Sequence, residues 1–184
     1  MLLVNGVRPS ALTAADLDSL DVGHFAMVFL ACTKASFGHY LLLRHSRNLW
    51  RVEVQSRKPQ TVGKKAFSVD VVWDPSPMQA LLKAHALLGS PSLASTLDAI
   101  DLQRFALLAL ACLDMSYGNF LLLRYAGKGH GGKRTVKVWK VDVQIRWGIR
   151  NWSTHVASSQ TSPFEALKRA REWLTAAHAA VRVL

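Results

Sequence analysis

The chain has 184 residues, half of them apolar and 19% charged, and its 23 basic against 12 acidic residues give a formal net charge of +11. This composition excludes an intrinsically disordered chain, and no apolar run approaches the ~20 residues of a membrane-spanning helix. The first ten residues lack an apolar segment with a small-residue cleavage site, so we expect no secretion signal. Two cysteines form neither a disulfide framework nor a metal site, which is typical of a cytoplasmic protein. The positive charge makes polyanions the expected partners, with nucleic acid ahead of a membrane surface.

An internal repeat is the most informative feature of the sequence. Residues 17–45 and 97–125 are identical at 14 of 29 positions, and the block Leu41 to Arg44 returns as Leu121 to Arg124. Two copies are too few for a solenoid but fit tandem domains or a fused pseudo-dimer. The breaker cluster Gly89-Ser-Pro-Ser92 predicts a boundary between a first repeat and a second one. The predicted domains are residues 1–90 and 91–184.

Helices are expected at the start and the end of each copy. Residues 21–37 and 101–117 are rich in alanine and leucine and are followed by a glycine, which favours a helix over a buried strand. Closing helices are predicted at Ser76-Pro77 and Ser162-Pro163, because serine caps a helix N-terminus and proline suits its first position.

Three strands are predicted between these helices. Residues 40–44 and 120–124 are short and apolar, and residues 137–147 alternate between an apolar and a polar face. Third strands follow at 66–73 and 151–156. We therefore expect an α+β protein of two tandem α-β-β-β-α repeats, each a three-stranded antiparallel sheet with helices on one face.

Positive charge is concentrated in two windows of the sequence. Residues 44–65 hold seven basic residues and one acid, and residues 124–150 hold eight and one, so the windows total +13 and the rest of the chain is at −2. This segregation favours phosphate binding over a sheet face kept basic for solubility. The residues expected to contact nucleic acid are Arg44, Arg47, Arg51, Arg57, Lys58, Lys64, Lys65, Arg124, Lys128, His130, Lys133, Arg134, Lys137, Lys140, Arg146, Arg150 and Lys168.

The loop from Gly127 to Arg134 is rich in glycine and basic residues. It nearly fits the loop that binds nucleotide phosphates, but Arg134 stands where a serine or threonine binds magnesium, and a strand follows instead of a helix. We therefore reject a nucleotide triphosphatase. The favoured interpretation is a basic finger that reaches into a nucleic-acid groove, and a hairpin tip without a partner is the alternative.

Signals for an enzyme or a stacking platform are weak. Strand parity places Trp50, Trp139 and Trp147 on the inward, apolar side, so we expect them in the core, and outward aromatics are not evident on the second strands. Cys32 and Cys112 lie at equivalent places on apolar helices, which favours buried packing. No cluster has metal-ligand spacing. We expect a non-enzyme without metal or cofactor.

The order α-β-β-β-α, with a basic hairpin that carries glycine and a histidine, resembles the double-stranded RNA-binding domain. That family's hairpin loop is similar to Gly127 to Arg134 with His130, and its closing helix reads Ser-Lys-Lys-x-Ala-Lys, of which Ser162 and Ala166 remain without the lysines. The resemblance implies that Lys168, a turn later, takes their place against phosphates. The first copy departs further, because its hairpin is only residues 45–48. The resemblance implies that the second repeat is the stronger binder of duplex RNA.

Two other functions stay open at this point. The fused repeats can mimic a homodimer of a strand-rich binder of single-stranded DNA, such as the Whirly proteins or the small transcriptional coactivators of similar build. Arg51, Lys140 and Arg146 on the outward sheet face then hold the strand. The third hypothesis is an adaptor whose basic face meets an acidic protein. The leading expectation is a non-catalytic protein that grips phosphates with both basic hairpins, as a monomer or a homo-oligomer.

Overall fold

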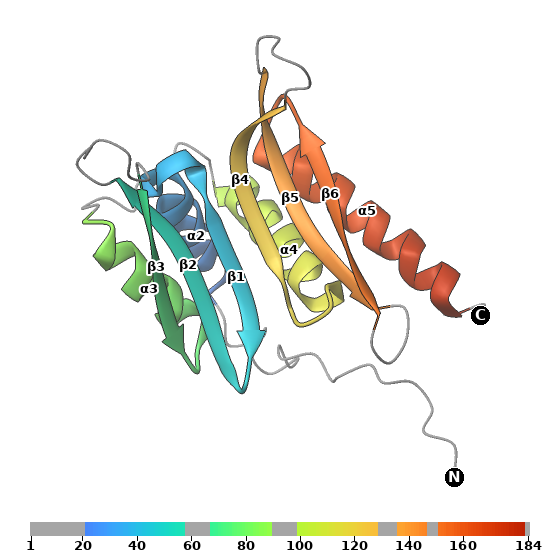
Figure 1. Cartoon of the computed structure of the whole chain (residues 1–184), viewed down its shortest axis with the longest axis horizontal. Coiled ribbons are helices and arrows are strands. Elements are labelled where there is room, and N and C mark those ends of the chain that lie inside the picture. Colours follow the sequence, from blue (N-terminus) through green and yellow to red (C-terminus); the bar gives the residue numbers. More distant parts are fainter. Residues whose placement is uncertain (1–20, 58–66, 90–98, 129–135, 147–150, 183–184) are drawn as a thin grey trace.

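The computed structural model describes residues 21–57, 67–89, 99–128, 136–146 and 151–182. The elements run helix, three strands, helix, and then again helix, three strands, helix (Figure 1). The helices are α2 (Val22–Ala35), α3 (Pro77–Leu87), α4 (Ala99–Met115) and α5 (Pro163–Arg182), with a 3-10 turn η1 (Phe37–His39) after α2. The strands are β1 (Leu41–Ser46), β2 (Leu49–Arg57), β3 (Phe67–Asp74), β4 (Leu121–Lys128), β5 (Val136–Arg146) and β6 (Trp152–Ser159). The predicted α+β class is confirmed.

All six strands form one antiparallel sheet in the order β3-β2-β1-β4-β5-β6. The prediction of two separate three-stranded sheets is therefore wrong. The join is the pairing of β1 with β4, in which Leu42 lies opposite Leu122. Each first strand carries three consecutive leucines, a pattern typical of a central strand that is buried on both faces. Their pairing also satisfies backbone groups that would otherwise lie at an open edge. The predicted boundary at residue 90 lies outside the described residues.

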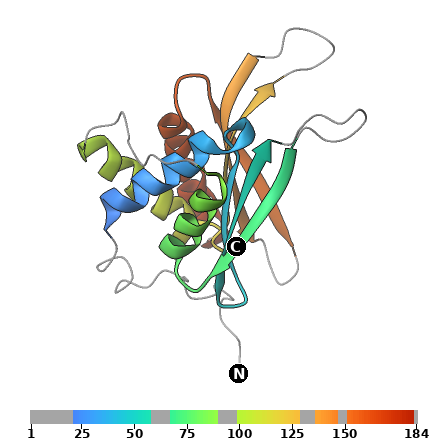
Figure 2. The ribbon, with the colours of Figure 1, turned by 90° about the vertical axis from the view of Figure 1, so that its left-hand side faces the viewer.

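The four helices within the described residues lie together on one side of the sheet (Figure 2). Asp21 caps α2 by accepting a hydrogen bond from the backbone N–H of His24 at 2.9 Å. The predicted serine caps of the closing helices are confirmed: the N–H of Gln79 donates to Ser76 Oγ at 3.4 Å, and that of Glu165 donates to Ser162 Oγ at 3.2 Å. These caps fix where the closing helices begin as they turn back onto the sheet.

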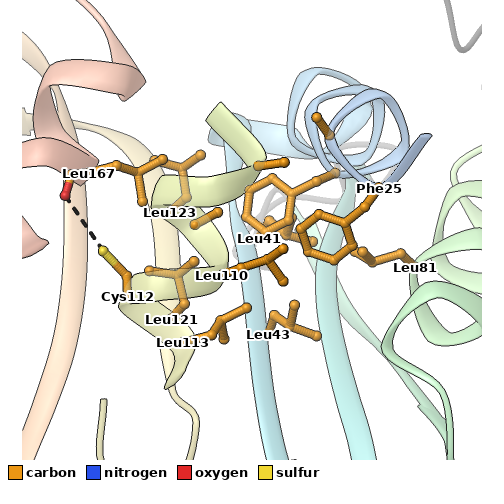
Figure 3. Close-up of a cluster of buried hydrophobic side chains, with 14 of the residues drawn as sticks. Phe25, Leu41, Leu43, Leu81, Leu110, Cys112, Leu113, Leu121, Leu123 and Leu167 are labelled. Carbon is orange, nitrogen blue, oxygen red and sulfur yellow. Dashed lines mark hydrogen bonds between the residues drawn. The ribbon is translucent and has the colours of Figure 1, made fainter. Parts of the chain in front are cut away.

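The core lies between this helix layer and the sheet and runs through both halves of the chain. Phe29 of α2 lies against Phe105 of α4 with ring centroids 5.7 Å apart, and both side chains are fully buried. Leu41 and Leu43 of β1 and Leu121 and Leu123 of β4 belong to the same buried cluster (Figure 3). Since the aromatic pair joins the two halves, the helix layer closes over a single continuous core.

Both cysteines are buried in this core, as predicted. Cys32 Sγ donates to the carbonyl of Leu81 at 3.3 Å, and Cys112 Sγ donates to that of Leu167 at 3.5 Å (Figure 3). Burial raises the pKa of each thiol to about 12. A thiol that stays protonated is a poor nucleophile and metal ligand, so both cysteines pack as small apolar side chains.

Candidate nucleic-acid interface

The sheet face opposite the helix layer presents the candidate site. Side chains alternate along a strand, so every second residue of each strand points away from the helices. One row of such residues crosses all six strands as successive cross-strand partners: Val71, Glu53, Leu42, Leu122, Asp142 and Val156. The open face is this central row together with Phe67, Val69, Trp73, Arg51, Gln55, Arg57, Arg44, Arg124, Lys140, Gln144, Arg146, Trp152, Thr154 and Ser158.

The open face is positively charged. It holds two carboxylates, both in the central row, and six cations, so its net charge is +4. The six cations all belong to the predicted set: Arg44, Arg51, Arg57, Arg124, Lys140 and Arg146. Cross-strand pairing brings cations from separate windows of the sequence onto one surface.

Each carboxylate of the central row is held by an arginine. Arg124 Nη2 donates to both oxygens of Asp142, at 2.8 and 3.2 Å, and Asp142 is almost fully buried. Glu53 instead pairs with Arg51 of its own strand, at 2.5 Å. Tyr40 donates to Glu53 at 3.4 Å, and its burial together with that negative charge raises the phenol pKa to about 12. These pairs shield the negative charges at the centre of the face.

Arg44 stands at the position on β1 that corresponds to Arg124 on β4 in the sequence repeat, but it forms no ion pair among the described residues. It lies opposite Arg51, which is already paired with Glu53. A guanidinium with five N–H donors and no carboxylate partner is suited to bind an oxyanion from outside the chain.

Aromatic side chains accompany the cations on this face. Trp73 is 43% exposed and Trp152 is 56% exposed. The guanidinium of Arg51 lies over the Trp73 ring, 5.2 Å from its centre, which is a cation–π distance. Exposed indoles on an uncovered sheet are unusual, because large apolar side chains are normally buried.

This aromatic surface was not predicted, because its outward aromatic residues lie on the third strands and not on the second. The third strand β3 has its pattern inverted: Val69, Val71 and Trp73 point outward, while Asp70 and Asp74 point toward the helices. A signal was present in the alternation of residues 67–74, but parity alone does not tell which of two faces is covered.

A shallow depression of about 330 Å³ opens on the same face beside the β1–β4 join. It has an aromatic ring at Tyr40, a cation at Arg124 and an apolar floor at Leu122. Its complete lining is Gly38, Tyr40, Gln55, Leu122, Arg124, Tyr125 and Ala126.

Three other predicted contact residues lie away from the open face. Arg47 has a φ of 53° and Asn48 one of 64°, so they form the tight turn between β1 and β2, where Arg47 is exposed. Lys137 is exposed near the β4–β5 hairpin, opposite Gly127. Lys168 is exposed on α5, in the layer on the other side of the sheet. A ligand on the open face does not reach Lys168.

The remaining predictions fall outside the described residues or concern the core. Trp50 is 2% exposed, which confirms its core position, whereas Trp139 is only partly buried and packs against the core beside Tyr125. Of Lys128 only the strand backbone is described. The residues outside the described ranges are Lys58, Lys64, Lys65, His130, Lys133, Arg134, Arg150 and Trp147.

Within the described ranges, no group of three or more His, Cys, Asp or Glu residues is placed to hold a metal ion. None of the helices described there is long and apolar enough to cross a membrane. Comparison of the chain with protein-family models, with curated proteins and with solved structures found no match.

Proposed function

We propose that this protein is a non-catalytic binder of single-stranded nucleic acid, and that the strand lies on the open face of the sheet. The observation that carries the proposal is the coincidence of six cations and two exposed tryptophans on the face that the described helices leave uncovered. Cations neutralise phosphates, and aromatic rings stack on unpaired bases.

The shape of the face favours a single strand over a duplex. The major groove of DNA admits a helix or a two-stranded ribbon, and a six-stranded sheet is too wide to enter it. The bases of a duplex are already stacked and paired, so the Trp73 and Trp152 rings have no free base face to meet there. Unpaired bases can be splayed onto a sheet and stacked on its aromatic side chains.

Each side chain on the face has a defined part in this proposal. Arg44, which has no ion pair among the described residues, binds a phosphate near the centre. Lys140 and Arg146 bind phosphates on the β5 side. Trp73 and Trp152 stack on bases, while Arg124 chiefly holds Asp142. Binding is therefore expected to be strongly salt-dependent and tolerant of sequence.

The two halves are, in this proposal, fused copies of one α-β-β-β-α unit. Besides the sequence repeat, the same contact ties the end of the first helix to the second strand in each half: Gln55 N–H donates to Ser36 Oγ and Gln144 N–H donates to Ser116 Oγ, both at 2.8 Å. This arrangement corresponds to the fused-dimer hypothesis for a single-strand binder.

The test is fluorescence anisotropy with single-stranded DNA, single-stranded RNA, duplex RNA and duplex DNA at two salt concentrations. We expect the single strands to bind most tightly. R44A should weaken binding and reduce the salt slope by roughly 0.7. R171A is the matched control, because it removes an exposed arginine from α5 in the helix layer, and it should leave binding unchanged.

Other outcomes point to the competing functions. Preference for duplex RNA would overturn the proposal in favour of the hairpin at residues 127–134. Equal losses from R44A and R171A would show that binding follows net charge and not the open face. No affinity for any nucleic acid at low salt would favour an adaptor for an acidic protein.

A further inference from the structure

We propose that the open face carries two equivalent base-stacking stations at opposite corners, and that its ligand is a strand long enough to bridge them. This inference rests on the proposed function and adds the length and the path of the ligand. The Phe67 station is Phe37, Arg57 and Phe67. The Trp152 station is Tyr117, Arg146 and Trp152.

The two stations share an arginine held over an aromatic ring, although they come from different halves. The guanidinium of Arg57 lies 5.5 Å from the centre of the Phe37 ring, and that of Arg146 lies 5.4 Å from the centre of the Tyr117 ring. Residues 37 and 117 both follow the serine at the end of a first helix. The arginine and the ring stand at corresponding places in the two halves, so the contact is a repeated feature of the surface.

Each station also has a second aromatic ring beside its arginine. Arg57 is paired across the β2–β3 ladder with Phe67, and Arg146 is paired across the β5–β6 ladder with Trp152. Phe67 stacks on Phe37 with ring centroids 5.7 Å apart, and Trp152 is 56% exposed. A base placed at either station therefore meets an aromatic ring and, next to it, a cation for the adjoining phosphate.

The strand register gives the separation of the stations. Arg57 lies four residues beyond Glu53 on β2, and Arg146 lies four residues beyond Asp142 on β5, in opposite directions from the central row. The two arginines are therefore eight residues apart along the strand direction and three strand spacings apart across the sheet, from β2 to β5. These separations correspond to a diagonal of about 30 Å. At the 3.4 Å rise of a stacked strand, about nine nucleotides span this distance, and a more extended strand needs fewer.

The path between the stations crosses the centre of the face at the Leu42–Leu122 pair. Arg44 and Arg124 lie two residues beyond these leucines, on β1 and β4, and so flank the diagonal on either side. Glu53 and Asp142 border the same centre, but each is neutralised by an arginine. A strand along the diagonal therefore passes the uncharged Gln55 and Gln144 and an apolar centre flanked by cations, and the two carboxylates beside its path are both paired.

Two stations on one rigid sheet make binding bivalent. An oligonucleotide that reaches only one station binds weakly, whereas one that reaches both gains the second contact intramolecularly. The prediction is a steep rise in affinity with length that levels off near nine nucleotides. Stacking on one aromatic is worth a factor of roughly 5 to 150 in affinity, so loss of a station should be readily measured.

The experiment measures the affinity of the full chain for oligothymidylates of about 4 to 15 nucleotides, using the wild type, F67L and W152L. Leucine keeps an apolar side chain but removes the stacking ring, and the melting temperature verifies folding. Both variants should lose at least about fivefold in affinity for the longest oligomer. Below the threshold length, the dependence of affinity on oligomer length should stay close to that of the wild type. W73L is the matched control: Trp73 is an exposed indole of the same face that lies outside both stations and off the path between them, so its loss should leave the length threshold in place.

The results separate this inference from the proposed function. If no oligothymidylate binds at any length, the proposed function itself fails. If oligomers bind but affinity rises smoothly with length, or if F67L and W152L behave like W73L, single strands still bind and the two-station inference is overturned. If the wild type shows a length threshold and either F67L or W152L removes it, one strand contacts both stations.

Discussion

Arg44 and Arg124 end the same Leu-Leu-Leu-Arg block in the two halves of the chain, yet they have different partners. Arg124 donates twice to Asp142, whereas Arg44 has no ion pair among the described residues. The residues opposite the two arginines differ. Arg51 faces Arg44 and pairs with Glu53 of its own strand, while Lys140 faces Arg124, and Arg124 pairs with Asp142.

One repeated arginine thus has a structural role in one half and is free for a ligand in the other. A bidentate arginine–carboxylate pair at an almost fully buried aspartate holds the strands in register. An arginine whose carboxylate has been taken by a neighbour keeps its donors for solvent or for a phosphate. Equivalent positions in a duplicated sequence therefore need not have equivalent functions: the neighbouring strand carries Arg51 and Glu53 in one half and Lys140 and Asp142 in the other, and the ion pairs differ with them.

The largest expected effect concerns the inward side of the two halves. Trp50 is 2% exposed, and its repeat counterpart Trp139 is only partly buried. We expect W50A to lower the free energy of unfolding by about 3–5 kcal/mol, and W139A by clearly less, because a cavity costs most where the surroundings cannot collapse or admit water. Urea denaturation followed by circular dichroism measures both. Equal losses would show that the two halves pack their second strands alike.

The next effect tests the comparison of the arginines directly. R124A leaves Asp142 buried without its partner and should cost about 1–3 kcal/mol of folding free energy. R44A breaks no ion pair and should change stability by less than about 0.5 kcal/mol. Thermal and urea denaturation give the two values.

The losses of affinity for a single strand should rank the two variants in the opposite order, with R44A above R124A. R44A should reduce the salt slope, and R124A should leave the slope nearer that of the wild type once the folded fraction is taken into account. If R124A lowers affinity and slope as much as R44A without a cost in stability, the division between a structural and a binding arginine is wrong.

Much of the fold follows from local patterns. The serine caps at Ser76 and Ser162, the buried Cys32 and Cys112 and the alternation of residues 137–147 are all decided within a few residues of the sequence. Such signals depend on backbone hydrogen bonding and side-chain periodicity, which operate at short range.

The arrangement of the sheet depends on long-range choices that the patterns do not encode. The leucines of β1 and β4 indicate central strands, but they do not say which strands pair with them. For the same reason the outward position of Trp73 was not predicted: alternation separates two faces without identifying the covered one. The cations of the site were predicted from composition alone, whereas their division into paired and unpaired residues required the register.

The smallest expected effect concerns the hydrogen bonds that join each closing helix to the end of its third strand. Lys83 of α3 donates to the carboxylate of Asp74 at 2.6 Å, whereas Arg169 of α5, at the matching position, donates to the backbone carbonyl of Ser158 at 2.7 Å. The hydrogen bond from Lys83, aided by the backbone N–H of Ser76, lowers the pKa of Asp74 below its usual 3.8. A carboxyl whose pKa is lowered by folding contributes stability above its unfolded pKa and loses it as the pH falls through the folded value.

The two helix attachments should therefore respond differently to acid. Both cations are exposed, so K83A and R169A should each cost less than about 1 kcal/mol at pH 7. The loss caused by K83A should fade as the pH drops below about 3.8, because protonated Asp74 no longer attracts the lysine in the wild type either. The loss caused by R169A should persist, since a backbone carbonyl does not titrate in this range. Melting temperatures of the wild type and both variants between pH 7 and pH 3 measure this, and parallel curves for K83A and R169A would contradict it.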